Sequence, residues 1–575
     1  MNAILVVIVG LLVGVLGYRL YSRPVDERVL QADPKKATPA KLYADGVDFM
    51  PASKSVLFGF QFKSIAALGP IIGPIVAAQW GWLPALLWIL LGTLFVGWVQ
   101  DYSSIMIGVR EEGQTFGALS YRLISPRGRT VLLIFIYFYL LLIMGAFGKI
   151  VGYDLMTKPS VPLGVLAVIG CGILAGQMTY AWRRNITQTT VVTVVLSFIG
   201  IWLGTLGPVQ AVFQAINGGE KSPVLFWGIT QEQVIWSLVV LAICYVGAVL
   251  PMFTWAQPIN YVSFWIIAAG MLGGVLGLLI WRPGFGDFPA FTGFTVAGLG
   301  PLWPILFVTV ACGAISGWHS LVSSSGTARQ LEKETDALPV GGGAMYMEMG
   351  LALIALLTAV VGFGSFAAYK GTLVKGPGGV FAGGLGTFLS YLGIPKAFGL
   401  AYGAVFLTIM ALTIMYLVVR FMRVASAEFV GDAVPAMRNI HVGTFVAVLL
   451  SLVLIWTGFW MRIWVLFGGA NQLMASLALM LVTIWLMSTG RKYLWTMIPM
   501  IFMFVTTVAA LLYTSYRVLY DLATIPNLTM DKIVGNVIAG AIGILLVVAA
   551  VILAWDALKA IRVQRTRLRA APARA

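Results

Sequence analysis

Charge is scarce in this sequence. Only 10% of its 575 residues are Asp, Glu, Lys or Arg, whereas soluble globular chains carry about 25%. Apolar residues make up 60%, and they recur in runs of about 18 or more, long enough to cross a hydrocarbon core of about 30 Å. The short alternating segments of a membrane β-barrel are missing. The sequence therefore predicts an all-α, polytopic membrane protein.

Cysteine and histidine are also rare, with 3 and 2 residues respectively. Cys171, Cys244 and Cys312 lie inside apolar runs without metal-ligand spacing, so we expect packing roles, no disulfide, no metal and no cofactor. His441 begins a span and is unremarkable, whereas His319 lies in an unusual polar run. No G-x-S-x-G elbow or soluble catalytic domain is present, which argues against an enzyme.

The net charge of +16 does not indicate nucleic-acid binding, because the basic residues fall between the apolar runs. With the N-terminus outside and the C-terminus in the cytoplasm, 26 of the 37 Lys and Arg residues fall on the cytoplasmic side and 9 outside. This bias predicts that orientation in the inner membrane, with the basic tail 559–575 facing anionic lipid. About fifteen spans are expected: 2–19, 56–78, 82–108, 130–151, 161–181, 187–205, 233–251, 260–281, 301–325, 343–364, 398–419, 442–461, 464–488, 494–513 and 536–555.

Three parts are expected along the chain. Residues 1–55 form a first span and a cytoplasmic loop, 56–490 the core, and 491–575 peripheral C-terminal helices with the basic tail. The glycine-rich segment 365–397 is interpreted as a flexible outer surface loop, with a re-entrant segment or lid as the alternative.

The second span is expected to be broken. Pro70 and Pro74 cannot donate to the carbonyls of Ala66 and Pro70, and Gly69 and Gly73 let the backbone open. Unpaired carbonyls at membrane depth are costly unless protein, water or a ligand satisfies them. Ala66, Gly69, Pro70 and Gly73 are therefore candidate substrate-binding positions, with a simple proline kink as the alternative.

The ninth span, "ACGAISGWHSLVSSSGT", is the second predicted break. Ser316, Ser320 and Ser323 share one helical face, Ser324 lies beside them, and His319 lies among them. Small residues also allow close helix packing, but that accounts for one or two serines only. These four serines and His319 are therefore candidate substrate-binding residues, and proton transfer is the other role open to His319. This span is expected to run opposite to the second, as in an inverted repeat.

The sequence "FGGANQL" in the thirteenth span is a third candidate interruption. Gly468 and Gly469 are expected to loosen the helix, and Asn471 and Gln472 place two amides there. The amides serve either substrate binding or interhelical contact.

Ionisable residues at membrane depth suggest function by default. Lys63 lies just before the first break and is a candidate proton carrier, with Asp101 as its partner or as a cation ligand. The alternatives are a plain ion pair and a charge at a helix end. Glu348, near the inner end of its span, is expected to reach water, and Lys149 to extend outward.

Five segments together resemble the carbon starvation protein A family: "YADGVDFMP", "FGFQFKSIAALGPIIGPIVAAQWGWLPALLWILLG", "GWVQDYSS", "FTGFTVAGLGPLWPILFVTVACGAISGWHSLVSSSGTARQLEKETDA" and "FGGANQLMASLALMLVTIWL". The resemblance implies an inverted-repeat core of the LeuT-like amino acid–polyamine–organocation type. It also implies uptake of peptides or pyruvate, the latter with protons. Phe60 and Gln61 stand where the family has two histidines, and Ile259 and Asn260 where it often has Arg-Asp. Departures of this kind can alter the substrate or the coupling ion, so the resemblance implies the fold and transport class more strongly than the substrate.

The resulting hypothesis is a secondary transporter that imports a peptide, amino acid or small carboxylate by alternating access. Its partners are the solute and a coupling ion, a proton rather than sodium, together with membrane lipid. The alternative is a passive channel or a nutrient sensor.

Overall fold

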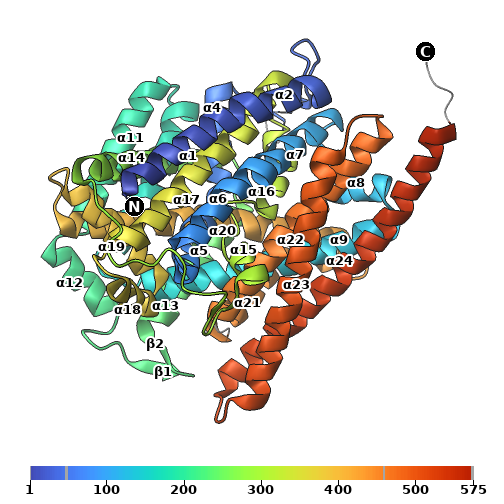
Figure 1. Cartoon of the computed structure of the whole chain (residues 1–575). Helices are drawn as coiled ribbons and strands as arrows, with labels where there is room; N and C mark the ends of the chain where they lie inside the picture. The colour runs from blue at the N-terminus through green and yellow to red at the C-terminus, as the bar shows by residue number, and fades with distance from the viewer. Residues whose placement is uncertain (1, 46–48, 458–459, 571–575) are drawn as a thin grey trace.

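The computed structural model describes residues 2–45, 49–457 and 460–570. Three parts of the sequence predictions fall outside the described residues. They are positions 46–48 of the "YADGVDFMP" motif, positions 458–459 at the end of the expected span 442–461, and the last five residues of the basic tail. The described chain is a bundle of helices with four short strands (Figure 1).

The first half of the chain contains fourteen α-helices among the described residues: α1 (Ala3–Gly17), α2 (Arg23–Val25), α3 (Pro39–Leu42), α4 (Lys54–Ile65), α5 (Gly69–Ala77), α6 (Trp82–Gly92), α7 (Trp98–Arg110), α8 (Phe116–Leu123), α9 (Pro126–Lys149), α10 (Pro162–Gly176), α11 (Ile186–Leu203), α12 (Gly207–Ile216), α13 (Gln231–Val249) and α14 (Ala256–Trp281).

The second half continues with α15 (Phe307–Thr309), α16 (Gly317–Val322), α17 (Gly343–Val361), α18 (Phe366–Lys375), α19 (Pro377–Ser390), α20 (Lys396–Val430), α21 (Ile440–Thr457), α22 (Trp460–Ser488), α23 (Leu494–Thr524) and α24 (Met530–Ala570). Two antiparallel strand pairs lie in loops: β1 (Val224–Phe226) with β2 (Ile229–Thr230), and β3 (Thr295–Val296) with β4 (Gly300–Pro301).

Thirteen helical segments among the described residues are long and apolar enough to cross a membrane, or fourteen if the bent pair Lys54–Ile65 and Gly69–Trp80 counts as one span. The all-α, polytopic fold class is therefore confirmed. The count of fifteen is not, because the expected span 301–325 is too interrupted to pass as a helix. The two expected spans that are not single long helices are the two predicted to be broken.

The core consists of α9, α17, α20 and α22, whose most apolar stretches are almost wholly buried. In α22 that stretch is buried completely, so this helix contacts protein on every side. Helices α23 and α24 form one edge of the molecule, red in Figure 1, and α24 packs on α23, α22 and α9. Apolar residues such as Val505 and Val551 remain exposed there, as expected of a surface that faces lipid.

The interpretation of 365–397 as a flexible surface loop is wrong. The segment forms α18 and α19, and Phe381, Leu385 and Phe388 of α19 are buried. Its glycines permit close contacts rather than disorder. A Cβ atom added to Gly399 of α20 would lie 2.9 Å from the Gly386 Cα atom, and one added to Gly386 would lie 3.1 Å from the Leu400 backbone nitrogen. Helix α19 therefore packs tightly on α20 and also contacts α17 and α14.

Loops that the sequence assigns to the same side of the membrane contact one another. On the expected inner side, Ala52 donates its backbone N–H to Gln330, and Arg127 pairs with Asp556 at 2.7 Å. On the expected outer side, Ala3 donates to the carbonyl of Pro283. The relative sidedness of these loops therefore agrees with the charge-based prediction.

Candidate functional site

Two interrupted helical segments lie antiparallel at the centre of the molecule. The first is α4 followed by α5, bent by 47°, and the second is α15 followed by α16. Contacts between them run in opposite sequence order. The Ser64 carbonyl accepts from the Trp318 indole at 2.7 Å, and a side chain added at Gly73 would meet the carbonyl oxygen of Thr309 at 2.6 Å. The predicted opposite direction of the two broken spans is confirmed.

The breaks have local causes. Helix α4 ends at Ile65, and Ala66 is extended with ψ 104°. Helix α5 begins at Gly69, with Pro70 in its first turn, where a missing N–H costs nothing. Pro74 lies inside α5 without ending it. The gap between α15 and α16 extends from residue 310 to 316, so both breaks fall where the sequence predicted an interruption.

Glycines let the two breaks approach each other. A side chain at Gly69 would clash with Cys312, and one at Gly313 would lie 3.4 Å from the Pro70 Cα atom. The nearest obstacles are the side chains of Cys312 for Gly69 and of Ala352 for Gly313, so both positions are closely packed. The residues around both breaks are buried, including Ala66, Leu68 and Ile315 at 0% exposure, so the described conformation is closed around them.

An acid–histidine–acid cluster lies beside the second break. The Nδ1 atom of His319 is 3.0 Å and 3.1 Å from the two carboxylate oxygens of Asp101 on α7. Its Nε2 atom is 3.2 Å from a carboxylate oxygen of Glu348 on α17. All three side chains are 0% exposed. We call Asp101, His319 and Glu348 the buried triad.

Several polar atoms of this cluster have no hydrogen-bond partner among the described residues. His319 Nε2 and Glu348 are within ion-pair distance, but the angles are not those of a hydrogen bond. His319 Nε2 and both carboxylate oxygens of Glu348 therefore lack a hydrogen-bond partner. The side-chain oxygen of Gln100 lacks one as well. Buried polar atoms without partners are expensive and cluster at functional sites. The triad is therefore suited to bind or release a proton or to contact a polar ligand.

Gln100 connects α7 to the second break. Its amide nitrogen donates to the Ser316 carbonyl at 2.9 Å and to the Ser320 hydroxyl. Ser316 itself is extended, with φ −148° and ψ 132°, and precedes α16. The predicted single helical face of Ser316, Ser320 and Ser323 is thus wrong, because the backbone opens at Ser316.

Asn471 and Gln472 satisfy the interrupted backbone. The Asn471 side-chain oxygen accepts from the Tyr139 hydroxyl at 2.6 Å, the Ser316 hydroxyl at 3.1 Å and the Trp318 N–H at 3.1 Å. The Gln472 amide donates to the Phe307 and Val310 carbonyls. The interhelical role of these amides is therefore observed directly.

The expected third interruption is absent from the described part of α22, which is helical through Gly468 and Gly469. A side chain at Gly468 would clash with the Val308 carbonyl, and one at Gly469 would lie 3.0 Å from Leu511. These glycines serve close packing beside α15 and α23 rather than unwinding of the helix.

The serines of the second segment fall into two groups. Ser323 Oγ accepts from the Gln61 amide at 2.9 Å, and Thr327 donates to the Gln61 side-chain oxygen, which joins this segment to α4. Ser324 donates to the Ser320 carbonyl at 2.8 Å within its own helix. The hydroxyls therefore hold the broken segment in place in this conformation.

Lys63 forms no hydrogen bond or ion pair with the triad among the described residues. Its ammonium group donates to Thr413 Oγ1 on α20 at 2.5 Å, the side chain is 0% exposed, and no carboxylate pairs with it among the described residues. The predicted pairing of Lys63 with Asp101 is not observed, because Asp101 faces His319. The neighbouring Ser64 accepts a hydrogen bond from Asn260 at 3.4 Å, and Asn260 in turn accepts from Tyr416 at 2.8 Å.

Ion pairs and hydrogen bonds link several segments on the expected inner side. Glu334, 0% exposed, pairs with Arg110 at the end of α7 at 3.0 Å and with Lys36 at 3.7 Å. Arg491 donates to the carbonyls of Val29 and Leu30 at 2.6 Å and 2.8 Å. These residues connect the ends of α7 and α22 to the segment after α1.

The sequence interpretation missed Glu348 and Gln100. Glu348 was expected to reach water, but from α17 it faces His319 of α16. The available signal was its isolation as the one charged residue of "GAMYMEMGLALIALLTAVV", since a lone intramembrane acid suggests a function.

In the described part of the chain no group of His, Cys, Asp and Glu is arranged to hold a metal ion.

Similar proteins exist among transporters. The chain is 32% identical over 381 residues to the "Peptide transporter CstA" of Escherichia coli K12, covering 63% of this chain and 50% of that protein. It is 31% identical over 368 residues to the E. coli "Pyruvate/proton symporter BtsT", covering 63% and 49%. The chain thus spans about half the length of these relatives. The Bacillus subtilis "Peptide transporter CstA" is 28% identical, with 88% of this chain and 89% of that protein covered.

Solved structures resemble the chain only distantly. The transporter MhsT in complex with L-phenylalanine has a TM-score of 0.46 at 13% identity, covering 88% of this chain and 99% of that chain. The Eremococcus coleocola manganese transporter has a TM-score of 0.43 at 12% identity, covering 90% and 99%.

The family model "Carbon starvation protein CstA" matches residues 2–370 and 365–510. Because these matches include both broken helices and all three residues of the buried triad, the chain belongs to the carbon starvation protein CstA family.

Proposed function

We propose that this protein is a secondary transporter that imports a small organic solute together with protons by alternating access. The observation that carries the proposal is the buried triad, placed where two antiparallel helices are interrupted. The names of the relatives, peptide transporters and a pyruvate/proton symporter, support the same class. We place the protein in the inner membrane with its N-terminus outside, on the positive-inside bias.

The triad is the proposed proton site. With both carboxylates ionised and His319 protonated, its net charge is −1, and one further proton makes it neutral. Changes of net charge within a low-dielectric interior carry large free energies, so protonation can bias one conformation over another. Asp101 keeps its predicted coupling role, and His319 and Glu348 share it.

Lys63 is the proposed partner of an anionic solute rather than the proton carrier. A buried ammonium group whose observed partner is a neutral hydroxyl gains strongly from a carboxylate. Lys63 also lies in the last turn of α4, directly before the break at Ala66. A carboxylate of a small organic acid, or the C-terminus of a peptide, fits this chemistry.

The other predicted site residues have different roles in the proposal. In the proposal, Ala66, Gly69, Pro70 and Gly73 supply mobile backbone, and Ser316, Ser320, Ser323 and Ser324 exchange their present contacts for the solute as the site opens. Asn471 and Gln472 hold the second break in register. The Arg110–Glu334 pair closes the inner side until solute and proton are bound.

The test is uptake into proteoliposomes of labelled pyruvate, other small carboxylates, amino acids and dipeptides, with and without an imposed proton gradient. The wild type should accumulate a solute only when the gradient is present. Glu348→Gln should abolish gradient-driven accumulation, and Lys63→Met should weaken binding of the anionic solute. Glu220→Gln, which changes an exposed outer acid, is the matched control and should transport normally.

A passive channel is the alternative function. It would give flux without accumulation and would not respond to the proton gradient. That result, or undiminished coupling in Glu348→Gln, would refute the transporter mechanism proposed here.

A further inference from the structure

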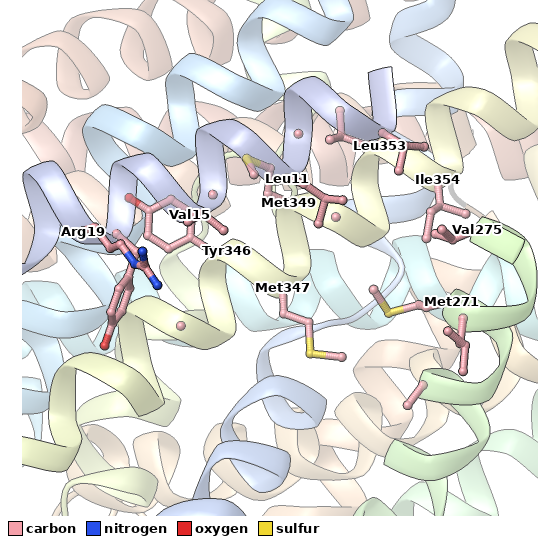
Figure 2. A pocket seen from close by; sticks show the side chains of 18 residues that line it. Leu11, Val15, Arg19, Met271, Val275, Tyr346, Met347, Met349, Leu353 and Ile354 are labelled. Atoms are coloured by element: carbon pink, nitrogen blue, oxygen red, sulfur yellow. The ribbon is translucent and has the colours of Figure 1, made fainter. Parts of the chain in front are cut away.

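An apolar groove lies on the outside of the helix bundle, away from the buried triad. It has a volume of about 750 Å³ and lies between α1, α14 and α17. Figure 2 shows its labelled side chains: Met271, Val275, Leu353 and Ile354 lie at one end and Arg19 at the other. Leu11 and Val15 along α1 are 64% and 49% exposed, so the groove opens toward the surrounding lipid.

The dimensions of the groove match one leaflet. The wall formed by α1 and the helical turn that follows it extends from Val7 to Arg19, about 18 Å at 1.5 Å per residue. Half of a hydrocarbon core of about 30 Å is about 15 Å. The apolar part is therefore as deep as an acyl chain of one leaflet extends.

The end of the groove carries a free positive charge. Arg19 is exposed and forms no hydrogen bond or ion pair through its guanidinium group within the described chain. A guanidinium group binds phosphate with paired hydrogen bonds. The charge-based orientation places this end at the inner leaflet, whose lipids carry negative charge.

We propose that the groove binds one phospholipid with an anionic headgroup. One acyl chain lies along α1 between α14 and α17, and the phosphate contacts Arg19. The site is also adjacent to the transport machinery. Met347 and Met349 line the groove on either side of Glu348 along α17, so the bound lipid packs against the helix that carries Glu348.

The structure offers a variant that fills the groove without disturbing the protein. A side chain added at Gly350 meets no atom within 4 Å, and Gly350 lines the groove. Gly350→Leu should therefore fold normally and occupy the space of the acyl chain. Arg19→Gln removes the charge alone, and Arg184→Gln removes an exposed charge on the same expected side of the membrane, away from the groove.

The experiment is native mass spectrometry of the purified full chain, titrated with phosphatidylglycerol or phosphatidylcholine. The wild type should bind one phosphatidylglycerol in preference to phosphatidylcholine. Arg19→Gln should weaken phosphatidylglycerol binding roughly fivefold and phosphatidylcholine binding by less, because the choline cation offsets the phosphate charge. Gly350→Leu should lose both lipids. Arg184→Gln should behave as the wild type, and the melting temperature of each variant reports folding.

Three results would overturn the proposal. Equal binding of the two lipids by the wild type would exclude headgroup recognition. If Arg184→Gln weakened phosphatidylglycerol binding as much as Arg19→Gln, the effect of Arg19 would come from the net charge of the protein and not from a contact with the lipid. A dimer that dissociates in Gly350→Leu would show that a second copy of the chain, not a lipid, occupies the groove.

Discussion

At the scale of single residues, the buried triad is the most demanding feature of the molecule. His319 lies between two carboxylates from different helices, and none of the three side chains contacts solvent. A buried ion pair contributes little net stability, but removing one partner leaves an uncompensated charge. The stability of the folded state should therefore depend strongly on His319, the central residue of the triad.

Replacement of His319 by Ala should destabilise the protein by about 3–5 kcal/mol, because Asp101 and Glu348 are then left buried and mutually repelling. Denaturant titration in mixed micelles measures this. Adding Glu348→Gln should recover part of the loss, since one charge disappears. His441→Ala, at an exposed histidine bound to Tyr245, should change stability by no more than about 0.5 kcal/mol. Equal losses at both histidines would contradict the pairing.

At the scale of elements, the fold depends on two interrupted helices whose backbones touch. The contact between Gly73 and the 309–310 backbone involves main-chain atoms, which cannot rotate away as a side chain does. The closed packing therefore tolerates no side chain at this position.

Gly73→Ala should destabilise the closed conformation by about 1–3 kcal/mol, the usual cost of overpacking. The thermal unfolding temperature and the rate of uptake should both be lower than in the wild type. Gly59→Ala is the control within α4, since its added carbon meets Phe264 at an ordinary 3.7 Å and alanine favours helix. A Gly73→Ala protein as stable as the Gly59→Ala protein would show that the two breaks do not pack as described.

The inner ionic contacts should act as a closure. Glu334→Gln weakens the pairs with Arg110 and Lys36, so the buried site should open more often toward the cytoplasm. Cys312, 2% exposed beside the second break, reports this in a Cys171→Ala, Cys244→Ala background. Its reaction with a thiol reagent applied from the inner side should accelerate several-fold.

Glu332→Gln provides the matched control for that experiment. Glu332 pairs with Lys41 at 3.5 Å, and both side chains are exposed, where an ion pair contributes about 0–1 kcal/mol. Labelling of Cys312 should then remain at the background rate. Equal acceleration in both variants would show that the Glu334 pairs do not hold the site closed.

At the scale of the whole molecule, the loops sort into two groups, each making contacts within its own side. The expected inner group holds most of the basic residues, as the positive-inside rule requires. Green fluorescent protein fused after the C-terminus should therefore fluoresce in bacterial cells. Alkaline phosphatase inserted in the 217–223 loop, on the expected outer side, should be active. The reverse pattern would invert the orientation and the proposed direction of import.

The sequence by itself determined the membrane class, nearly all the spans, both broken helices and several residues beside them. These properties are local: hydropathy over one span fixes its environment, and proline with glycine interrupts a helix wherever it occurs. Asp101, His319, Lys63 and the serines could be singled out for the same reason, as polar groups in an apolar setting.

Only the tertiary structure decided which of those residues meet. Asp101 and His319 are 218 positions apart, and nothing local to either residue indicates that Asp101 faces His319 rather than Lys63. Glu348 joins them because α17 packs beside both breaks, and Gly468 serves packing because α15 passes over it. Such pairings depend on how helices from distant parts of the chain are rotated and placed against one another, which the polarity of one segment does not specify.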